Sequence, residues 1–285
     1  MSPISKEDVV NLREKTGAGL IDCKRALADS NGDMEEAISI LRKKGVASAA
    51  KKAGRDAGEG IIAQYLNDDR SKGILVQVNC ETDFVAKNKD FISFSQEVAQ
   101  NFLVNPEIDL ESKRTEQVAK IGENIRISRS ESLAPSGNGL VESYVHTGSK
   151  VAVLIAISSD LPLAEGSKTK VQSLAKDLCM HIAATSPVCV SRDNVPSELV
   201  EKEKEIALAQ AEGKPPQAIE KIVQGKLEKY FSTSCLLEQP FVKDPDHAIK
   251  DLLSSLGKDV GAALGVESFI RFQVGENSLR ERTHS

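Results

Sequence analysis

The feature that most constrains the fold is a weak internal repeat of a β-hairpin pattern. Residues 60–78 contain two apolar, β-favouring runs around a polar turn at residues 67–69, and this pattern predicts an antiparallel pair of strands. Residues 139–157 repeat the pattern around a turn at Gly148, and both copies place a tyrosine at the end of the first run. A repeated hairpin predicts two related halves, each of which must bury its sheet against other elements.

Each predicted hairpin is followed by an amphipathic helix pattern and, later, by a third apolar run. Apolar side chains recur at helical spacing in both copies, at Phe91, Phe94, Val98 and Phe102 and at Val171, Leu174, Leu178 and Ile182. Late candidate strands at residues 125–127 and 269–272 each contain an Ile-Arg pair. The predicted fold class is therefore α+β, with a core of two related halves at residues 60–138 and 139–276. Each half is expected to be a small antiparallel sheet with helices.

Residues 1–45 predict a separate module of three short helices. Asp33 is a suitable N-cap for the third helix, which we expect to end before Gly45. Lysines and arginines then continue into a basic connector at residues 46–59, part of which is expected to be helical. Such a charge run indicates either a solvated face or a strip that touches RNA or an acidic partner.

Residues 197–231, within the second half, predict an inserted helical hairpin. A charged helical run ends at Gly213 and the prolines after it, and a second helical run begins there. Two helices of similar length joined by a short loop pack antiparallel. Their seam is predicted to contain Leu199, Ile206, Leu208, Ile219, Ile222, Val223 and Leu227. Both a packed hairpin and an arm that holds a partner fit this pattern. Residues 277–285 are expected to be a short polar tail.

Composition and charge argue against several functional classes. Lys plus Arg is 37 and Asp plus Glu is 42, a net charge of −5, so binding of DNA or RNA through overall charge is not expected. Aromatic residues are only 4%, which is few for base stacking. The longest apolar run is residues 151–157, so we predict neither a membrane span nor a signal peptide. The five dispersed cysteines indicate reduced thiols in the cytoplasm.

Motifs of a nucleotide site or an active site are missing from the sequence. Residues 166–169 and 256–259 lack the spacing of a phosphate-binding loop, so direct nucleotide binding is not expected, nor is a cofactor or a metal. His181 lies in an apolar helical pattern, which favours a core histidine over a catalytic one. We therefore expect a chain that is not an enzyme. A hydrolase whose residues meet only in space is the alternative.

The segment at residues 78–88 differs from its surroundings because polar residues flank Phe84 where a predicted strand ends. A phenylalanine beside Asp83 at this point has two readings. It either fills the core next to a helix cap or is displayed as an anchor for a partner, since interfaces concentrate energy in buried aromatic residues.

Two long strings of residues resemble the elongation factor Ts family. Leu12-Arg-Glu-Lys-Thr-Gly-Ala-Gly-Leu-Ile-Asp-Cys-Lys-Arg-Ala-Leu27 resembles its N-terminal signature, and Val78-Asn-Cys-Glu-Thr-Asp-Phe-Val-Ala-Lys87 resembles its second signature. Shorter matches at residues 120–124, 200–203, 213–215 and 269–272 extend the resemblance over nearly the whole chain. It implies a ubiquitin-associated-like domain at residues 1–45, a core of two halves and a projecting hairpin.

The resemblance also implies a function, a guanine nucleotide exchange factor for elongation factor Tu in translation elongation. Such a factor binds Tu in its GDP-bound or nucleotide-free state and promotes GDP release so that GTP can rebind. The implied wedge consists of Asp83 and Phe84 with Thr82 and Val85 beside them, and its phenylalanine inserts between two helices of the partner near the Mg²⁺ and phosphates. Other implied partner-binding residues are His146, Arg13, Leu20 and Ile21.

Some observations leave other readings open. Leu20 and Ile21 are candidates for the core as well as for a contact. The tail at residues 277–285 is shorter than the C-terminal helix of some family members, and Gln77 stands where the family often has an acidic residue. A second hypothesis is a binding module without exchange activity, which docks RNA, a ribosome or a polypeptide through the N-terminal helices and the basic connector.

Overall fold

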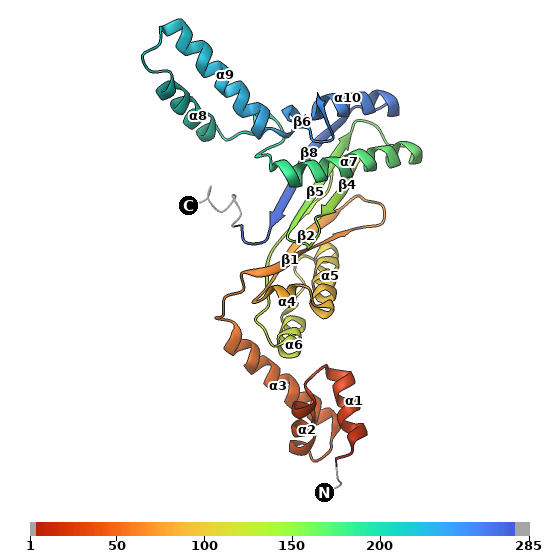
Figure 1. Cartoon of the computed structure of the whole chain (residues 1–285). Helices are drawn as coiled ribbons and strands as arrows, with labels where there is room; N and C mark the ends of the chain where they lie inside the picture. The colour runs from red at the N-terminus through yellow and green to blue at the C-terminus, as the bar shows by residue number, and fades with distance from the viewer. Residues whose placement is uncertain (1–3, 277–285) are drawn as a thin grey trace.

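The structure, a computed structural model, describes residues 4–276, and the predicted polar tail lies outside the described residues. The molecule is elongated, with three N-terminal helices at one end, a helical hairpin at the other and two small sheets between them (Figure 1). The predicted α+β class, with N-terminal helices and two small antiparallel sheets backed by helices, is confirmed.

The N-terminal helices are α1 (Lys6–Thr16), α2 (Leu20–Asp29) and α3 (Met34–Lys52). Asp33 caps α3 by accepting a hydrogen bond from the Glu36 backbone at 2.9 Å, as predicted. The prediction that this helix ends before Gly45 is wrong, because it continues to Lys52. Gly45 is buried where α3 crosses α6, and a Cβ placed there would lie 3.2 Å from the Cβ of Ala119. The glycine allows two helices to approach and does not end one.

Two three-stranded antiparallel sheets form the body. The first has the order β1 (Glu59–Leu66), β2 (Gly73–Cys80), β3 (Arg126–Leu133), and the second has the order β4 (Gly139–Val145), β5 (Val151–Ser159), β8 (Leu264–Gln273). The predicted hairpins and late strands are thus confirmed, and the late strand of each half pairs with the second hairpin strand. A register shift falls after Gln77 in β2 and after Ala156 in β5, which are corresponding positions.

Corresponding residues of the two halves also contact each other. The hydroxyl of Ser143 hydrogen-bonds to the side chain of Gln64, and these residues are 79 positions apart. The Ile62 backbone N–H donates to the Ser149 carbonyl at 2.8 Å, and the equivalent bond runs from Val141 to Arg70 at 2.7 Å. Such reciprocal contacts are what a pseudo-two-fold relation between the two hairpins produces.

Two glycines are required by the same geometry in both halves. Gly60 and Gly139 have φ values of 146° and 151°. A Cβ at these positions would lie 2.3 Å and 2.0 Å from the carbonyl oxygens of Val78 and Ile157. Only glycine permits this close approach of one strand to the next.

The body has four layers, in which two sheets face each other and helices cover their outer faces. Apolar residues of both sheets, among them Ile62, Leu75 and Leu154, form the core between the sheets. Helices α4 (Asp83–Ala86), α5 (Lys89–Val104) and α6 (Glu111–Ile121) cover the first sheet. Helices α7 (Glu165–Thr185) and α10 (Ile249–Val260) cover the second, beside the short pair β6 (Pro240–Phe241) and β7 (Asp244–Ala248).

The helical hairpin consists of α8 (Ser197–Gln210) and α9 (Pro216–Ser234), and it projects from the second half (Figure 1). Its predicted seam is only partly right. Val223 is buried, and Ile219, Ile222 and Leu227 are half-buried. Leu199, Ile206 and Leu208 are exposed. Ala207 of α8 and Ala211, the residue after this helix, are buried in their place, so small side chains fill this part of the hairpin.

Candidate functional site

Phe84 is 81% exposed, the most exposed large apolar side chain of the part of the chain that the structure describes. It lies in α4, a single turn that follows β2 directly. The Thr82 hydroxyl caps this turn by accepting a hydrogen bond from the Val85 backbone at 3.3 Å. Val85 and Ala86 pack inward against the core of the first half. The reading of Phe84 as a core residue is therefore wrong, and the inward side chains of α4 hold its ring in solvent.

Glu123, from the loop after α6, fixes the segment that carries Phe84. Its Oε2 accepts hydrogen bonds from the backbone N–H groups of Glu81 and Thr82, both at 3.0 Å, and its Oε1 accepts one from the Thr82 hydroxyl at 2.6 Å. In return, the Glu81 carboxylate accepts a hydrogen bond from the Asn124 backbone at 2.6 Å. Hydrogen bonds to an ionised carboxylate are about twice as strong as neutral ones. Sequence reasoning missed Glu123, although it lies in one of the segments that resemble the family.

Asp83 forms an ion pair with Lys87 one helical turn later, at 2.8 Å. The hydrogen bond and charge of Lys87 lower the pKa of Asp83 below its ordinary value, and Asp83 raises the pKa of Lys87. Both side chains are exposed, so the pair is stabilised little by its surroundings and can exchange for other partners. The exposed ring thus stands beside an ionised carboxylate.

Beneath this turn lies the buried thiol of Cys80, which donates a hydrogen bond to the Thr82 carbonyl at 3.2 Å. Burial raises the pKa of Cys80 to about 12. The thiol is therefore protonated at neutral pH and supports the turn through packing and this hydrogen bond.

His146 is exposed in the turn between β4 and β5, where its Nδ1 lies 2.9 Å from the Tyr144 hydroxyl. The same turn contains Lys150, whose ammonium group pairs with Glu59 and donates to the Gly60 carbonyl at 2.9 Å. Glu59 is in turn the strand partner of Cys80, from which the Phe84 segment continues. These contacts place the His146 turn and the Phe84 turn at the same end of the body.

Arg13, Leu20 and Ile21 lie in α1 and α2, apart from the Phe84 turn (Figure 1). All three are exposed, with Leu20 at 46% and Ile21 at 76%. The core of the N-terminal module is formed instead by neighbours that include Leu12, Cys23 and Leu27. The reading of Leu20 and Ile21 as core residues is therefore wrong, and they form an apolar surface separate from the Phe84 turn.

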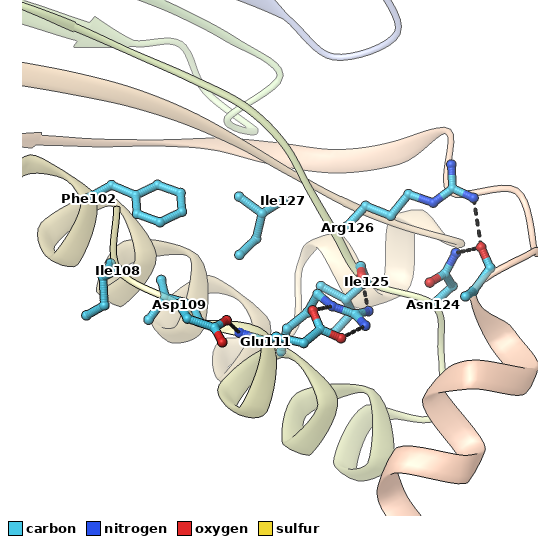
Figure 2. A pocket seen from close by; sticks show the side chains of 11 residues that line it. Phe102, Ile108, Asp109, Glu111, Asn124, Ile125, Arg126 and Ile127 are labelled. Carbon is cyan, nitrogen blue, oxygen red and sulfur yellow. Dashed lines mark hydrogen bonds and ion pairs between the residues drawn. The ribbon is translucent and has the colours of Figure 1, made fainter. Parts of the chain in front are cut away.

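A surface pocket of about 390 Å³ lies between the α5–α6 loop, α6 and the start of β3 (Figure 2). Phe102, Ile108 and Ile127 form its apolar side. Its polar side is paired internally, since the Arg114 guanidinium bonds to the Glu111 carboxylate and to the Ile125 carbonyl at 2.8 Å. The pocket thus presents no unpaired acid, base or nucleophile to a substrate.

His181 is buried in α7, as expected of a core histidine. Its Nε2 lies 2.8 Å from the side-chain oxygen of Gln239, and its Nδ1 accepts from the Val242 backbone at 3.3 Å. Among residues 4–276 no group of three or more His, Cys, Asp or Glu side chains could hold a metal ion. No helix in the same range is long and apolar enough to cross a membrane.

Comparison with known proteins gives one consistent result. A sequence model described as "Elongation factor TS" matches residues 81–276, a span that begins at the Phe84 segment. The chain is 42% identical to "Elongation factor Ts" of Clostridium botulinum (strain Eklund 17B / Type B), over 96% of this chain and 93% of the relative. It is 44% identical to that of Clostridium perfringens (strain SM101 / Type A), with the same coverage. It is 43% identical to that of Prosthecochloris aestuarii, over 96% of this chain and all of the relative.

Proposed function

Because this chain belongs to the elongation factor Ts family and so has a role in translation elongation, we propose that it is a guanine nucleotide exchange factor for elongation factor Tu. It binds Tu in the GDP-bound or nucleotide-free state and promotes GDP release, so that GTP can rebind. It acts as a binding partner in the cytoplasm and not as an enzyme. Nucleotide and Mg²⁺ are bound by Tu, and this chain requires no cofactor.

The single observation that carries the proposal is the exposed ring of Phe84 on a turn whose backbone is fixed by hydrogen bonds. Keeping a phenylalanine in water forgoes about 2 kcal/mol of burial free energy, which becomes available when a partner buries the ring. The Thr82 cap and the Glu123 carboxylate fix the backbone beneath it. Little backbone entropy is therefore lost on binding, and more of the burial energy remains for moving elements of the partner.

Exchange then follows from thermodynamic linkage. A factor that binds nucleotide-free Tu more tightly than Tu–GDP weakens GDP binding by the same ratio. We propose that Phe84 inserts between two helices of the nucleotide domain and that the neighbouring Asp83 competes for hydrogen bonds near Mg²⁺. The ion pair of Asp83 with Lys87 is exposed, so the carboxylate can leave it at small cost.

Two further surfaces support docking in this proposal. His146 contacts the partner from the same end of the body as Phe84, with its ring oriented by the Tyr144 hydroxyl. Arg13, Leu20 and Ile21 form a second contact on the N-terminal helices, where an apolar pair and a guanidinium make a compact anchor. The separation of the two surfaces along the molecule allows the factor to hold Tu at one point while Phe84 acts at another.

The direct test is the release rate of a fluorescent GDP analogue from Tu of the same organism. We expect the rate to rise with the concentration of this chain and then to saturate. A complex that forms, for example in size-exclusion chromatography, without any faster release would contradict exchange activity. Absence of a complex would contradict the choice of partner.

A further inference from the structure

We propose that Cys189 and Cys235 are a modification site, a dithiol that closes to a reversible disulfide when the chain meets a hydroperoxide. The bond joins the two ends of the segment that forms the helical hairpin. The proposal rests on the geometry of this pair and does not depend on the partner of the chain.

The two thiols are already neighbours in the fold. Their sulfur atoms are 3.8 Å apart, and the two residues form an isolated parallel β-bridge. The Leu236 backbone N–H donates to the Cys189 carbonyl at 2.9 Å, and the Val188 N–H donates to the Ser234 carbonyl at 2.8 Å. A disulfide needs a sulfur separation of about 2.05 Å, and we expect side-chain rotation to bring the two sulfurs together while the backbone partners stay the same.

The pair also has a route for a small oxidant. Cys189 is 9% exposed and lines a groove of about 810 Å³ between β8 and the segment at residues 186–190, whereas Cys235 is fully buried. A peroxide therefore reaches Cys189 first. The remaining cysteines, Cys23, Cys80 and Cys179, are fully buried. Each donates to a backbone carbonyl, as Cys189 does to that of Ser191 at 3.2 Å, so exposure and a neighbouring thiol distinguish Cys189 from them.

Hydrogen peroxide is the only oxidant that this reaction requires. The Cys189 thiol first loses its proton, and the thiolate attacks one oxygen of hydrogen peroxide. The O–O bond breaks, Cys189 becomes a sulfenic acid, and the other oxygen takes up the released proton and leaves as water. The Cys235 sulfur then attacks the Cys189 sulfur, the S–S bond forms, and the S–O bond breaks with release of a second water. Two thiols are oxidised and one peroxide is reduced. A thiol such as dithiothreitol or glutathione reverses the bond by exchange.

The reaction is expected to be slow compared with that of an activated cysteine. Burial raises the pKa of Cys189, and it raises the pKa of Cys235 to about 12. The thiolate fraction at neutral pH is therefore small. The pair responds to sustained oxidation and stays reduced under ordinary cytoplasmic conditions.

Closing the bond would reinforce the base of the helical hairpin, which already depends on polar contacts. Arg192, just before α8, pairs with Glu228 of α9 at 2.6 Å and with Glu238 after α9. Its guanidinium also lies 4.7 Å from the ring centroid of Phe231. Arg192 thus links an exposed carboxylate of α9 to the half-buried Glu238 through non-covalent contacts alone. A covalent bond between Cys189 and Cys235 would add to this network and stop the last turn of α9 from separating from the body.

The test treats the full reduced chain with hydrogen peroxide and then alkylates the free thiols in denaturant. We expect the five free thiols to fall to three, a tryptic fragment that links Cys189 to Cys235, and recovery of all five after dithiothreitol. Cys189→Ser and Cys235→Ser should abolish the linked fragment, whereas Cys179→Ser should retain it. Circular dichroism of each variant verifies that it is folded. Hydrogen exchange at the C-terminal turn of α9 should slow in the oxidised wild-type chain.

Several outcomes would overturn the proposal. One is a folded wild-type chain that keeps five thiols while added peroxide oxidises a free thiol in the same tube. Another is a disulfide that links two chains or involves a different cysteine. Unchanged hydrogen exchange in the oxidised chain would refute the reinforcement of the hairpin, although the modification site itself would stand.

Discussion

Replacement of Phe84 by alanine should separate partner binding from folding. The ring is 81% exposed, so its loss should change the free energy of unfolding by no more than about 0.5 kcal/mol. If the partner buries the ring, the complex loses about 2 kcal/mol, which corresponds to roughly a 30-fold weaker affinity for nucleotide-free Tu. The rate of GDP release at subsaturating factor should fall by a similar factor.

The assay follows release of a fluorescent GDP analogue over a range of factor concentrations. Val104→Ala is the matched surface control, because Val104 is 79% exposed at the end of α5 and should leave the release rate unchanged. Phe91→Ala is the matched core control, since Phe91 is fully buried and its truncation should cost about 3–5 kcal/mol of stability. The first control tests whether loss of any exposed apolar side chain slows GDP release. The second gives the loss of stability that follows when a buried phenylalanine is removed.

The reasoning is refuted if Phe84→Ala is folded and accelerates GDP release with the wild-type concentration dependence. It is also refuted if the variant loses stability to the extent of Phe91→Ala, because the ring would then be structural. If Val104→Ala slowed GDP release as much as Phe84→Ala does, any exposed apolar residue would contribute as much, and the special role of Phe84 would be refuted.

Three further predictions concern the surroundings of the site and the core. Glu123→Gln replaces one acceptor oxygen by an NH₂ group, which faces the N–H and O–H donors of residues 81 and 82. Hydrogen exchange at residues 82–87 should therefore speed up and GDP release should slow. Unchanged hydrogen exchange at these residues would contradict the role of this carboxylate. Lys87→Met should return the pKa of Asp83 towards its ordinary value in an NMR titration, and a wild-type midpoint in the variant would assign the shift to another group. Burial lowers the pKa of His181, so the unfolded state binds its proton first as pH falls. The free energy of unfolding should therefore decline below about pH 6.5, and it should decline less in His181→Gln. The measurement is urea unfolding at a series of pH values, and an equal dependence of the free energy on pH in both proteins would refute this.

The sequence predicted the two-sheet frame because the pattern that specifies a hairpin is local and occurs twice. Alternating apolar residues and turn residues are sufficient to indicate β1–β2 and β4–β5, and the amphipathic spacing after them indicates α5 and α7. Helices α6 and α10 were missed. Helix α6 buries few apolar residues, which weakens its apolar period, and α10 follows the short pair β6–β7.

Other misses have tertiary causes. Gly45 resembles a helix end in sequence, but the contact with Ala119 requires a small residue inside α3. In the hairpin, Ala207 and Ala211 are buried where larger residues were predicted for the seam, because close packing decides which side chains fit and an apolar pattern does not encode it. The exposure of Phe84 could not be predicted from apolarity, since it depends on α4 turning Val85 inward. Glu123 was missed because its partners are some forty residues away, at Glu81 and Thr82.

The candidate site lies where the two copies of the repeat diverge. The two copies are equivalent up to the end of the second hairpin strand. The first acidic residue after that strand also has the same role in both, because it accepts a backbone hydrogen bond. Glu81 accepts a hydrogen bond from the Asn124 backbone, and Asp160 accepts one from the Ala263 backbone, both at 2.6 Å. The first copy then continues into α4, whereas the second continues through Leu161 and a proline to α7. Leu161 stands at the position of Thr82 and has no hydroxyl, so the second copy lacks the side-chain cap that Thr82 gives to the first turn of α4. The shared frame accounts for the stability of both halves, and the single-turn helix found in only one of them accounts for the exposed ring.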